Sequence, residues 1–340
     1  MAGTEARRVA AIDCGTNSIR LLIADVTSAS EAAPSVLSDV DRRMTVVRLG
    51  EGVDTSGEFS PAALERTFAA VEDYAARIAA HGAERVRFVA TSASRDAANR
   101  DEFLSGVTER VRAAVPDFDG PEVVDGDEEA ALSFAGAAGV LDWDALLAAH
   151  PEGKVLVVDL GGGSTEFVLG TAAGAEHGES TDMGCVRFAE RYLRSDPPTH
   201  DEIRAATAEV RRILGALSVP LHEVRAVVGV AGTVTTITAH ALALTEYDPA
   251  RINGARLPVA AVTEAAEDLV SMERADRAQL GFMHPGRVDV IGAGALIWSL
   301  ILEHVNDVTG EAAGSCVASE HDILDGIALS IGEQRTAVQR

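Results

Sequence analysis

The stretch VLVVDLGGGSTEFVLG, residues 155–170, decides the fold. An apolar run ends at Asp159, a glycine turn follows, and a second apolar run starts after Glu166. Two apolar runs joined by a short glycine turn predict a β-hairpin, with the two acids on opposite arms. The turn also lets backbone N–H groups approach an anion without side-chain obstruction. Its residues are Gly161, Gly162, Gly163 and Ser164.

A second stretch, VAAIDCGTNSIRLLIADV at residues 9–26, has the same pattern. It aligns with the first without gaps at an offset of 146 residues, so Asp13 matches Asp159 and Arg20 matches Glu166. A single glycine hairpin with two solvated acids needs no functional explanation. Two copies at matching places suggest a duplicated domain and favour a functional interpretation.

Helical and strand patterns alternate along the rest of the chain. Residues 60–82 predict a helix with Ser60 as N-cap, and residues 198–217 predict one with a capping box. Strands are expected at 44–53 and 84–91, and residues 224–242 are expected to be strand, glycine turn and helix. This alternation predicts an α/β protein, with two similar lobes facing each other across a cleft.

The bulk composition narrows the function classes. A length of 340 residues fits two domains, and the net charge of −24 argues against binding to duplex nucleic acid. The three cysteines form no CxxC pair, and the short polar start MAGTEARR gives no leader, so we expect a cytoplasmic protein. The longest apolar stretch, 290–302, is too short to span a bilayer and predicts a buried helix.

Several side chains could bind or hydrolyse a phosphate. A Mg²⁺ ion is the natural partner shared by phosphate oxygens and the carboxylates of Asp159 and Glu166. Arginine suits phosphate binding, which makes Arg20 and Arg95 candidates. Gly232 and Thr233 begin a predicted helix, where an anion can bind.

A cluster of acids at another predicted helix start has two interpretations. The acids could simply favour the helix dipole, or one of them could accept a proton from an attacking water. Spacing alone does not choose between these interpretations. The cluster comprises Asp125, Asp127, Glu128 and Glu129.

Together, these segments resemble the exopolyphosphatase and guanosine pentaphosphate phosphohydrolase family, in the actin, sugar kinase and Hsp70 ATPase superfamily. The matching stretches follow the family's order along the whole chain: AAIDCGTNSIRLLIADV, VVRLGEGVDTSGEFSPAALERT, VATSASRDAAN, GDEEAALSF, VVDLGGGSTEFVLG, MGCVRFAERYL, GVAGTVTTITA and SEHDILDGIAL. The resemblance implies a two-lobed actin-like ATPase fold of the ribonuclease H-like type. It implies an N-terminal lobe at 1–130, rejoined by a C-terminal helix at 322–338, and a second lobe at 131–321.

The resemblance also implies site roles. Glu129 falls on the family's catalytic base, and Asp159 and Glu166 fall on its metal ligands. Asp13 is expected to help hold the hydration shell of the metal, which is Mg²⁺ or Mn²⁺. Phosphate contacts of the family fall on Gly15, Thr16, Asn17, Ser18, Arg20 and Arg95.

Two departures from the family pattern matter. Ala131 stands where the family often has arginine, so a phosphate contact from that position is missing. Long members carry an additional C-terminal helical region, and this chain resembles the short, two-domain form.

The expected reaction is hydrolysis of the terminal phosphoanhydride bond of inorganic polyphosphate, which releases orthophosphate. Guanosine pentaphosphate is the alternative substrate. A kinase or ATPase of the same superfamily and a non-catalytic polyphosphate or alarmone sensor are the other classes considered. We expect no nucleic-acid or membrane partner, and relatives suggest a homodimer.

Overall fold

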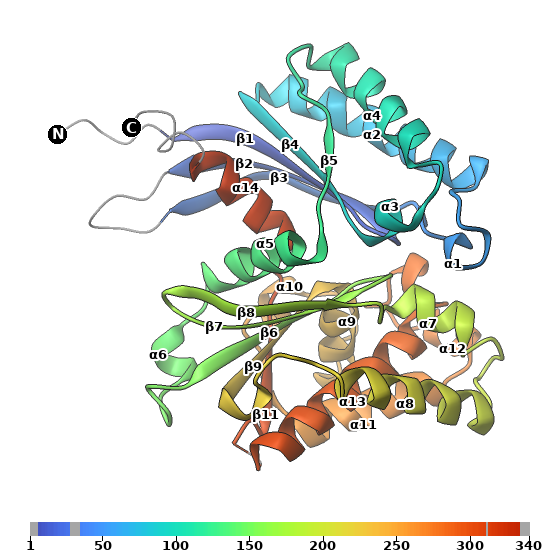
Figure 1. Ribbon diagram of the computed structural model, residues 1–340, viewed down its shortest axis with the longest axis vertical. Coiled ribbons are helices and arrows are strands. Elements are labelled where there is room, and N and C mark those ends of the chain that lie inside the picture. Colours follow the sequence, from blue (N-terminus) through green and yellow to red (C-terminus); the bar gives the residue numbers. More distant parts are fainter. Residues whose placement is uncertain (1–5, 28–34, 311, 334–340) are drawn as a thin grey trace. The chain divides into compact units, whose positions relative to one another are not determined.

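The computed structural model describes residues 6–27, 35–310 and 312–333. The chain forms two compact units, each built around a mixed β-sheet (Figure 1). Unit 1 comprises the described residues of 1–139 and 323–340, and unit 2 comprises those of 140–322. The helix predicted at 322–338 is observed as α14 (Ile323–Glu333), and its last predicted residues lie outside the described range.

The sheet of unit 1 has the strand order β3-β2-β1-β4-β5. Its strands are β1 (Arg7–Cys14), β2 (Ser18–Thr27), β3 (Val36–Val46), β4 (Arg85–Ala90) and β5 (Pro121–Val123). β1 and β2 form the predicted antiparallel hairpin, whereas β4 is parallel to β1 and β5 is parallel to β4. The carboxyl ends of three parallel strands therefore meet at one edge of the sheet.

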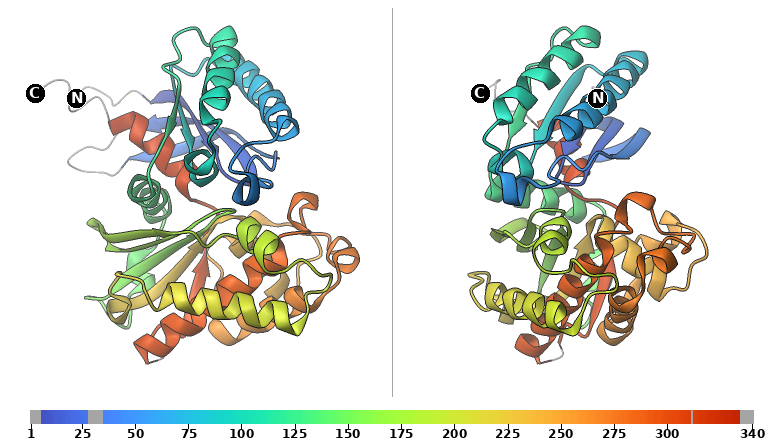
Figure 2. Two further views of the ribbon diagram at one scale, coloured as in Figure 1. Left: turned by 45° about the vertical axis from the view of Figure 1, so that its right-hand side comes forward. Right: turned by 90° about the vertical axis from the view of Figure 1, so that its right-hand side faces the viewer.

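Helices cover both faces of this sheet. They are α1 (Val53–Ser56), α2 (Pro61–His81), α3 (Ser92–Asp96), α4 (Arg100–Ala114), α5 (Gly126–Ala138) and α14. α2 and α4 lie side by side on one face, where they pack on Ile12 and Leu21 (Figure 2). α5 and α14 pack on the other face, against Ala11 and Leu22. Both faces are buried, which explains the nearly continuous apolar runs in β1 and β2.

Local capping explains why α2 begins and ends where the sequence predicts. The Ser60 hydroxyl accepts a hydrogen bond from the Ala63 amide (3.2 Å), and Pro61 occupies the first turn. Gly82 ends the helix in the left-handed conformation, at φ 65°. The helix prediction for residues 60–82 is therefore confirmed.

The strand predicted at 44–53 is wrong over most of its length. β3 ends at Val46, and the backbone then turns through Arg48 at φ 50° and Gly52 at φ 76°. The amides of Val47 and Arg48 turn back toward the β1–β2 hairpin, as described below, instead of extending the strand. Tertiary hydrogen bonds thus override a locally strand-like sequence.

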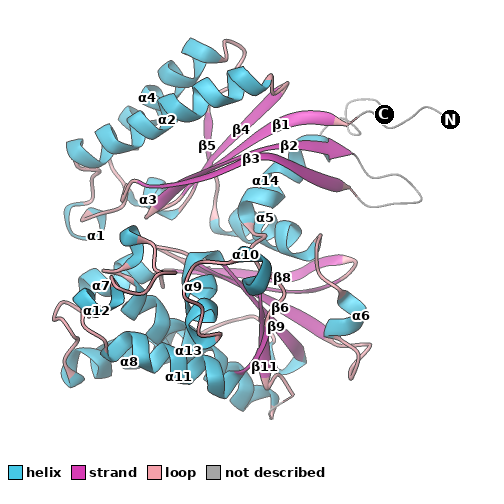
Figure 3. Ribbon diagram, turned by 180° about the vertical axis from the view of Figure 1, so that it is seen from behind, coloured by secondary structure: helices cyan, strands magenta, loops and turns pink. Residues whose placement is uncertain are grey.

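The sheet of unit 2 has the order β10-β11-β9-β6-β7-β8. Its strands β8, β6, β9 and β11 are labelled in Figure 3. Its strands are β6 (Lys154–Leu160), β7 (Thr165–Thr171), β8 (Gly174–Thr181), β9 (Val224–Val230), β10 (Arg256–Pro258) and β11 (Ser315–Ala318). β6 and β7 form the second predicted hairpin, and β6 and β11 both run parallel to β9.

The longer helices of unit 2 pack around one large apolar core, which includes Trp298. The α-helices of this unit are α6 (Trp143–Leu146), α7 (Cys185–Arg191), α8 (His200–Leu214), α9 (Ala231–Ala241), α10 (Pro249–Ile252), α11 (Val259–Ser271), α12 (Arg274–Arg277) and α13 (Ile291–Thr309). The apolar stretch 290–302 forms the buried first part of α13, as predicted. Among the described helices, none combines the length and the apolar character needed to cross a membrane.

Candidate functional site

The two hairpins have the same geometry. In the first, the Gly15 amide donates to the Ser18 carbonyl at 3.0 Å, and in the second the Gly161 amide donates to the Ser164 carbonyl at 3.0 Å. The strand registers also agree, since Asp13 faces Arg20 and Asp159 faces Glu166. The predicted alignment of the two stretches is therefore confirmed at the level of backbone hydrogen bonds.

Neighbouring backbone holds the carbonyl groups of the first turn. The Gly50 amide donates to the Thr16 carbonyl (2.9 Å), and the amides of Val47 and Arg48 both donate to the Asn17 carbonyl (3.1 and 2.8 Å). The segment after β3 thus fixes the turn. The Thr16 side chain is fixed as well, because its hydroxyl lies 3.0 Å from that of Ser92 in α3.

The start of α7 does the same for the second turn. Backbone amides of Cys185 and Val186 donate to the carbonyls of Gly161 and Gly162 (3.0 and 2.9 Å). The side chain of Arg187 adds a bond from Nε to the Gly163 carbonyl (2.8 Å). With these carbonyls engaged, the amides of Gly162 and Gly163 donate to no acceptor among the described residues. They are available to an anion such as phosphate.

Gly184 makes the close approach of α7 to the second turn achievable. A Cβ added there would overlap the Gly162 carbonyl, and a backbone group cannot move away as a flexible side chain can. We predict that Gly184→Ala displaces the turn and lowers the phosphate release that the resemblance implies by at least about tenfold. Steady-state kinetics of the purified variant will measure this effect. Gly139→Ala is the control, because its added carbon meets nothing closer than 3.4 Å; equal activities of the two variants would contradict the prediction.

In unit 1, three loops meet at the carboxyl edge of the parallel strands. Cys14 pairs with Ala90, and Ala90 pairs with Val123, so the segments that follow these strands start side by side. They carry the first glycine turn, Arg95 of α3 and Glu129 of α5. Ligands of open α/β sheets commonly bind at such an edge.

Glu129 is the residue of the acidic cluster that the structure singles out. It is 7% exposed, whereas Asp125, Asp127 and Glu128 are exposed. Asp125 caps α5 by accepting a hydrogen bond from the Glu128 amide (2.9 Å). The three exposed acids thus fit the helix-start interpretation, and the buried one does not.

Arg95 holds the Glu129 carboxylate in place. Its Nη1 donates to Glu129 Oε2 (2.6 Å) and to the Val124 carbonyl (3.0 Å). Burial raises the pKa of Glu129, while the Arg95 charge and its hydrogen bond lower that pKa, and the net shift is upward. The Nε and Nη2 atoms of Arg95 donate to no described residue, so the guanidinium can bind an anion and Glu129 together.

Asp13 and Arg20 form an ion pair across the first hairpin. Nη2 of Arg20 lies 2.7 Å from Asp13 Oδ2, and Nε lies 2.9 Å from the same oxygen. Asp13 is 5% exposed. The aspartate therefore holds Arg20 beside the glycine turn, and its assignment to the hydration shell of a metal stays a prediction.

The matching position in unit 2 has two acids instead of an ion pair. Asp159 and Glu166 face each other directly across β6 and β7 and are 7% and 1% exposed. Two carboxylates in such a position repel each other, and a shared cation relieves that repulsion. The Ser180 hydroxyl donates to Glu166 Oε1 at 2.8 Å, which fixes the orientation of that carboxylate.

This pair of acids fits a magnesium ion. Mg²⁺ is commonly held by one or two carboxylates, with substrate phosphate oxygens and waters completing the octahedron. Among the described residues, no three or more histidine, cysteine or acidic side chains are grouped so that they could hold a metal ion. The glycine turn lies between the two acids in sequence, so phosphate and metal can be bound together.

Gly232 and Thr233 lie in the first turn of α9, as predicted, but the glycine turn expected between strand and helix is not formed. β9 continues directly into α9, so Gly232 is the second residue of the helix and lies in no separate turn. Thr233 is 6% exposed and packs against Gly294 and Cys185 of α13 and α7. Ala231 takes the left-handed conformation at φ 71°, a strained geometry that is often found at functional sites.

Arg287 is a cation at this helix start that sequence reasoning missed. Its guanidinium occupies the space where a Cβ of residue 232 would lie, and its Nη1 donates to the Thr236 hydroxyl at 3.0 Å. Its only signal in the sequence is a single arginine in HPGRVDV, just before the apolar helix. The start of α9 therefore carries a guanidinium as well as helix amides.

With this geometry in view, comparisons with known proteins identify the family. The sequence model of the Ppx/GppA phosphatase family matches residues 22–331. The chain belongs to the Ppx/GppA phosphatase family. This membership confirms the family resemblance seen in the sequence. The two mixed sheets with their flanking helices confirm the α/β class, and the actin-like assignment stays a prediction.

Relatives of this family match the chain over nearly its whole length. Exopolyphosphatase 2 of Mycobacterium tuberculosis is 50% identical over 330 residues, which are 95% of this chain and 98% of that protein. The crystal structure of an exopolyphosphatase-like protein is 41% identical with a TM-score of 0.90, and covers 98% of this chain and 99% of its own. The Ppx/GppA family member from Aquifex aeolicus is 28% identical with a TM-score of 0.75, over 98% of this chain and 99% of its own.

Proposed function

We propose that this protein is an exopolyphosphatase, which hydrolyses the terminal phosphoanhydride bond of inorganic polyphosphate and releases orthophosphate. The name of the 50% identical relative supports the substrate class. The observation that carries the chemistry is the buried Glu129 carboxylate, held by Arg95 at the sheet edge where the first glycine turn also begins.

The phosphate-binding groups in this proposal are backbone amides and arginines. The fixed turns at residues 15–18 and 161–164 supply amides, and Arg20 and Arg95 supply guanidinium groups. Such groups neutralise phosphate oxygens, as the transition state of phosphoryl transfer requires. They matter in a chain of net charge −24, because its overall field repels a polyanion. Arg287 places a further cation at the start of α9.

Asp159 and Glu166 would hold Mg²⁺ or Mn²⁺, which supplies charge neutralisation for the phosphoryl oxygens when bound. The Ser180 hydroxyl fixes the orientation of the Glu166 carboxylate by donating to Oε1, and the other carboxylate oxygen would be the one to bind such an ion. In our proposal Asp13 assists metal binding indirectly: it holds Arg20 in place and bonds to water molecules in the hydration shell of the metal ion. The homodimer and the cytoplasmic location suggested by the resemblance stay predictions.

Glu129 is proposed to orient a water molecule for in-line attack and to accept its proton. A carboxylate with a raised pKa is a stronger base than an ordinary glutamate. Arg95 limits that rise by stabilising the ionised form. The pair thus sets both the position and the basicity of the proposed base.

The Arg95–Glu129 pair leads to a prediction about pH. The base acts when ionised, so kcat falls as the pH drops through the pKa of Glu129, which is raised from 4.5. Because Arg95 lowers that pKa, Arg95→Met should move the acidic limb of the kcat–pH profile to higher pH. Profiles of the wild type and the variant will test this, with exposed Arg100→Met as control. An unchanged limb would exclude Glu129 as the titrating group.

The substrate proposal is tested by direct comparison. Orthophosphate release is measured with Mg²⁺ on linear polyphosphates of several lengths and on guanosine pentaphosphate. We expect a higher kcat/KM for polyphosphate. A clear preference for guanosine pentaphosphate would assign the chain to the other activity, and Mg²⁺-independent binding without phosphate release would indicate a sensor.

A further inference from the structure

α14 packs against the helix that carries Glu129, at very short range. A Cβ added at Gly326 of α14 would overlap the carbonyl of Leu132 in α5 and lie 3.2 Å from the Gly136 amide. Only glycine allows the two backbones to approach this closely. Leu132 lies three residues after Glu129, so this contact is about one helical turn from the proposed base.

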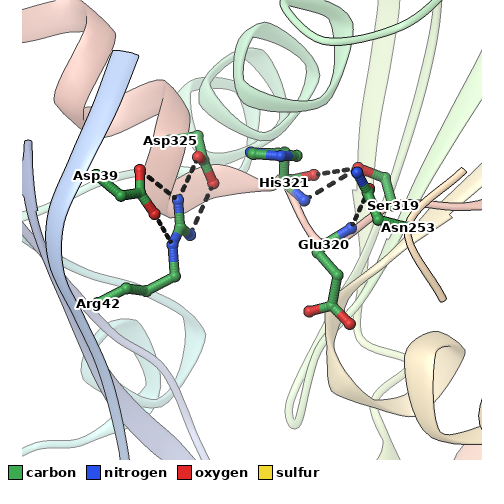
Figure 4. Close-up of polar contacts among 7 residues, drawn as sticks. All are labelled: Asp39, Arg42, Asn253, Ser319, Glu320, His321 and Asp325. Atoms are coloured by element: carbon green, nitrogen blue, oxygen red, sulfur yellow. Dashed lines mark hydrogen bonds and ion pairs between the residues drawn. The ribbon is translucent and has the colours of Figure 1, made fainter. Parts of the chain in front are cut away.

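An ion pair joins α14 to the sheet at Asp325, the residue before Gly326. Asp325 is 1% exposed, and both of its carboxylate oxygens accept hydrogen bonds from Arg42 of β3, at 2.6 and 3.1 Å (Figure 4). Arg42 also donates to Asp39 from Nε at 2.7 Å. A paired, buried carboxylate of this kind resists sliding of the helix, because separating the pair leaves a buried charge uncompensated.

A second arginine joins α14 to the first turn of α5. Nη1 of Arg87 donates to the Ser330 hydroxyl (2.8 Å), and Nη2 donates to Glu128 Oε1 (2.5 Å) and to Glu122 Oε2 (2.9 Å). Arg87 is itself on β4. A single guanidinium on β4 therefore links α14 to Glu128, the residue next to Glu129.

From these contacts we infer that α14 is a positioning element for Glu129, and that Gly326 is the positioning residue that sets the height of α5 above the sheet. The Glu129 carboxylate accepts a hydrogen bond from Arg95, and the backbone of α5 packs against α14. A displacement of α5 would move the carboxylate relative to Arg95 and to the glycine turn, both of which are held by other elements. This inference rests on the catalytic role proposed for Glu129.

The test is a double-mutant cycle with Gly326→Ala and Glu129→Gln, assayed by orthophosphate release from polyphosphate. Gly326→Ala is expected to lower kcat by about 10–100-fold with KM within a few-fold of wild type, because a shift of about 1 Å is enough for such a loss. In the Glu129→Gln background the same substitution should cost no further activity. Gly139→Ala, which adds a carbon 3.8 Å from Leu329 in the same helix pair, is the matched control.

Each outcome of the cycle decides a different question. If Glu129→Gln removes turnover while Gly326→Ala behaves like Gly139→Ala, the positioning inference fails and the proposed function stands. Equal losses from Gly326→Ala in both backgrounds would show general disruption of the fold, which also overturns the inference. Full activity in Glu129→Gln would overturn the catalytic role and the inference together. If Gly326→Ala does not fold, Ser330→Ala and Asp325→Asn replace it in the cycle, with the same non-additive loss of kcat expected.

Discussion

Glu129→Gln is expected to lower kcat for orthophosphate release by about 10²–10⁴-fold, the usual cost of removing a general base. The amide keeps the size and polarity of the side chain, but it cannot accept a proton from the attacking water. The glycine turns and the arginines are unchanged, so KM for polyphosphate should stay within a few-fold of wild type. Steady-state kinetics with equilibrium binding of polyphosphate will separate the two effects.

The control for this substitution is Asp127→Asn, which removes an exposed carboxylate from the same turn of α5. It should leave kcat unchanged, because Asp127 is exposed in the structure. Loss of polyphosphate binding in Glu129→Gln would assign this residue to substrate binding, and near-normal turnover would end its role as the base.

Asp159→Asn and Glu166→Gln are expected to raise the Mg²⁺ concentration needed for half-maximal activity by more than about tenfold and to lower the maximal rate. Each substitution removes one of two negative charges that face each other across β6 and β7. The measurement is a Mg²⁺ titration of phosphate release, with Mn²⁺ as a second ion. Metal binding to the protein without substrate, followed by calorimetry, gives a readout that does not depend on turnover.

Removal of an exposed acid just before the same strand, Glu152→Gln, is the control for the metal prediction. It should leave the Mg²⁺ requirement unchanged. If Asp159→Asn and Glu166→Gln have the Mg²⁺ dependence of the wild type, the metal is bound elsewhere and these acids serve the fold alone.

The parts of the fold that the sequence predicts well are those encoded by local patterns. The two glycine hairpins are observed at the predicted alignment, since a tight turn fixes the register of both arms. The capping box of Thr199 and Glu202 is observed at the start of α8 for the same reason, because its hydrogen bonds join neighbours in sequence.

The parts that local sequence patterns leave open or miss depend on contacts between distant segments. Spacing alone leaves four acids near residue 127 equivalent, and the resemblance rather than the spacing selects Glu129, which tertiary packing buries and pairs with Arg95. The roles of Arg187 and Arg287 were not predicted for the same reason, because their hydrogen-bond partners lie more than 20 residues away in the sequence. No periodicity in the sequence marks an arginine that bonds to a turn in another part of the unit.

The two hairpins share a backbone register but carry different side chains at matching positions. At matching positions the first has the pair Asp13 and Arg20, which neutralise each other, and the second has Asp159 and Glu166, which do not. The backbone is the same in both, so the side chains decide the chemistry. This division supports the proposal that one hairpin presents a guanidinium and the other a metal ion to the same class of ligand.

The most direct test of the proposed function compares linear polyphosphate with cyclic metaphosphate, which has the same anhydride bonds and no terminal phosphoryl group. Phosphorus NMR distinguishes orthophosphate, chain ends and internal phosphates during the reaction. We predict that the linear chain yields orthophosphate from the start of the reaction, and that the ring is stable in the presence of the enzyme and Mg²⁺. Hydrolysis of the ring, or cleavage of linear chains into fragments before orthophosphate accumulates, would contradict attack at the terminal phosphate.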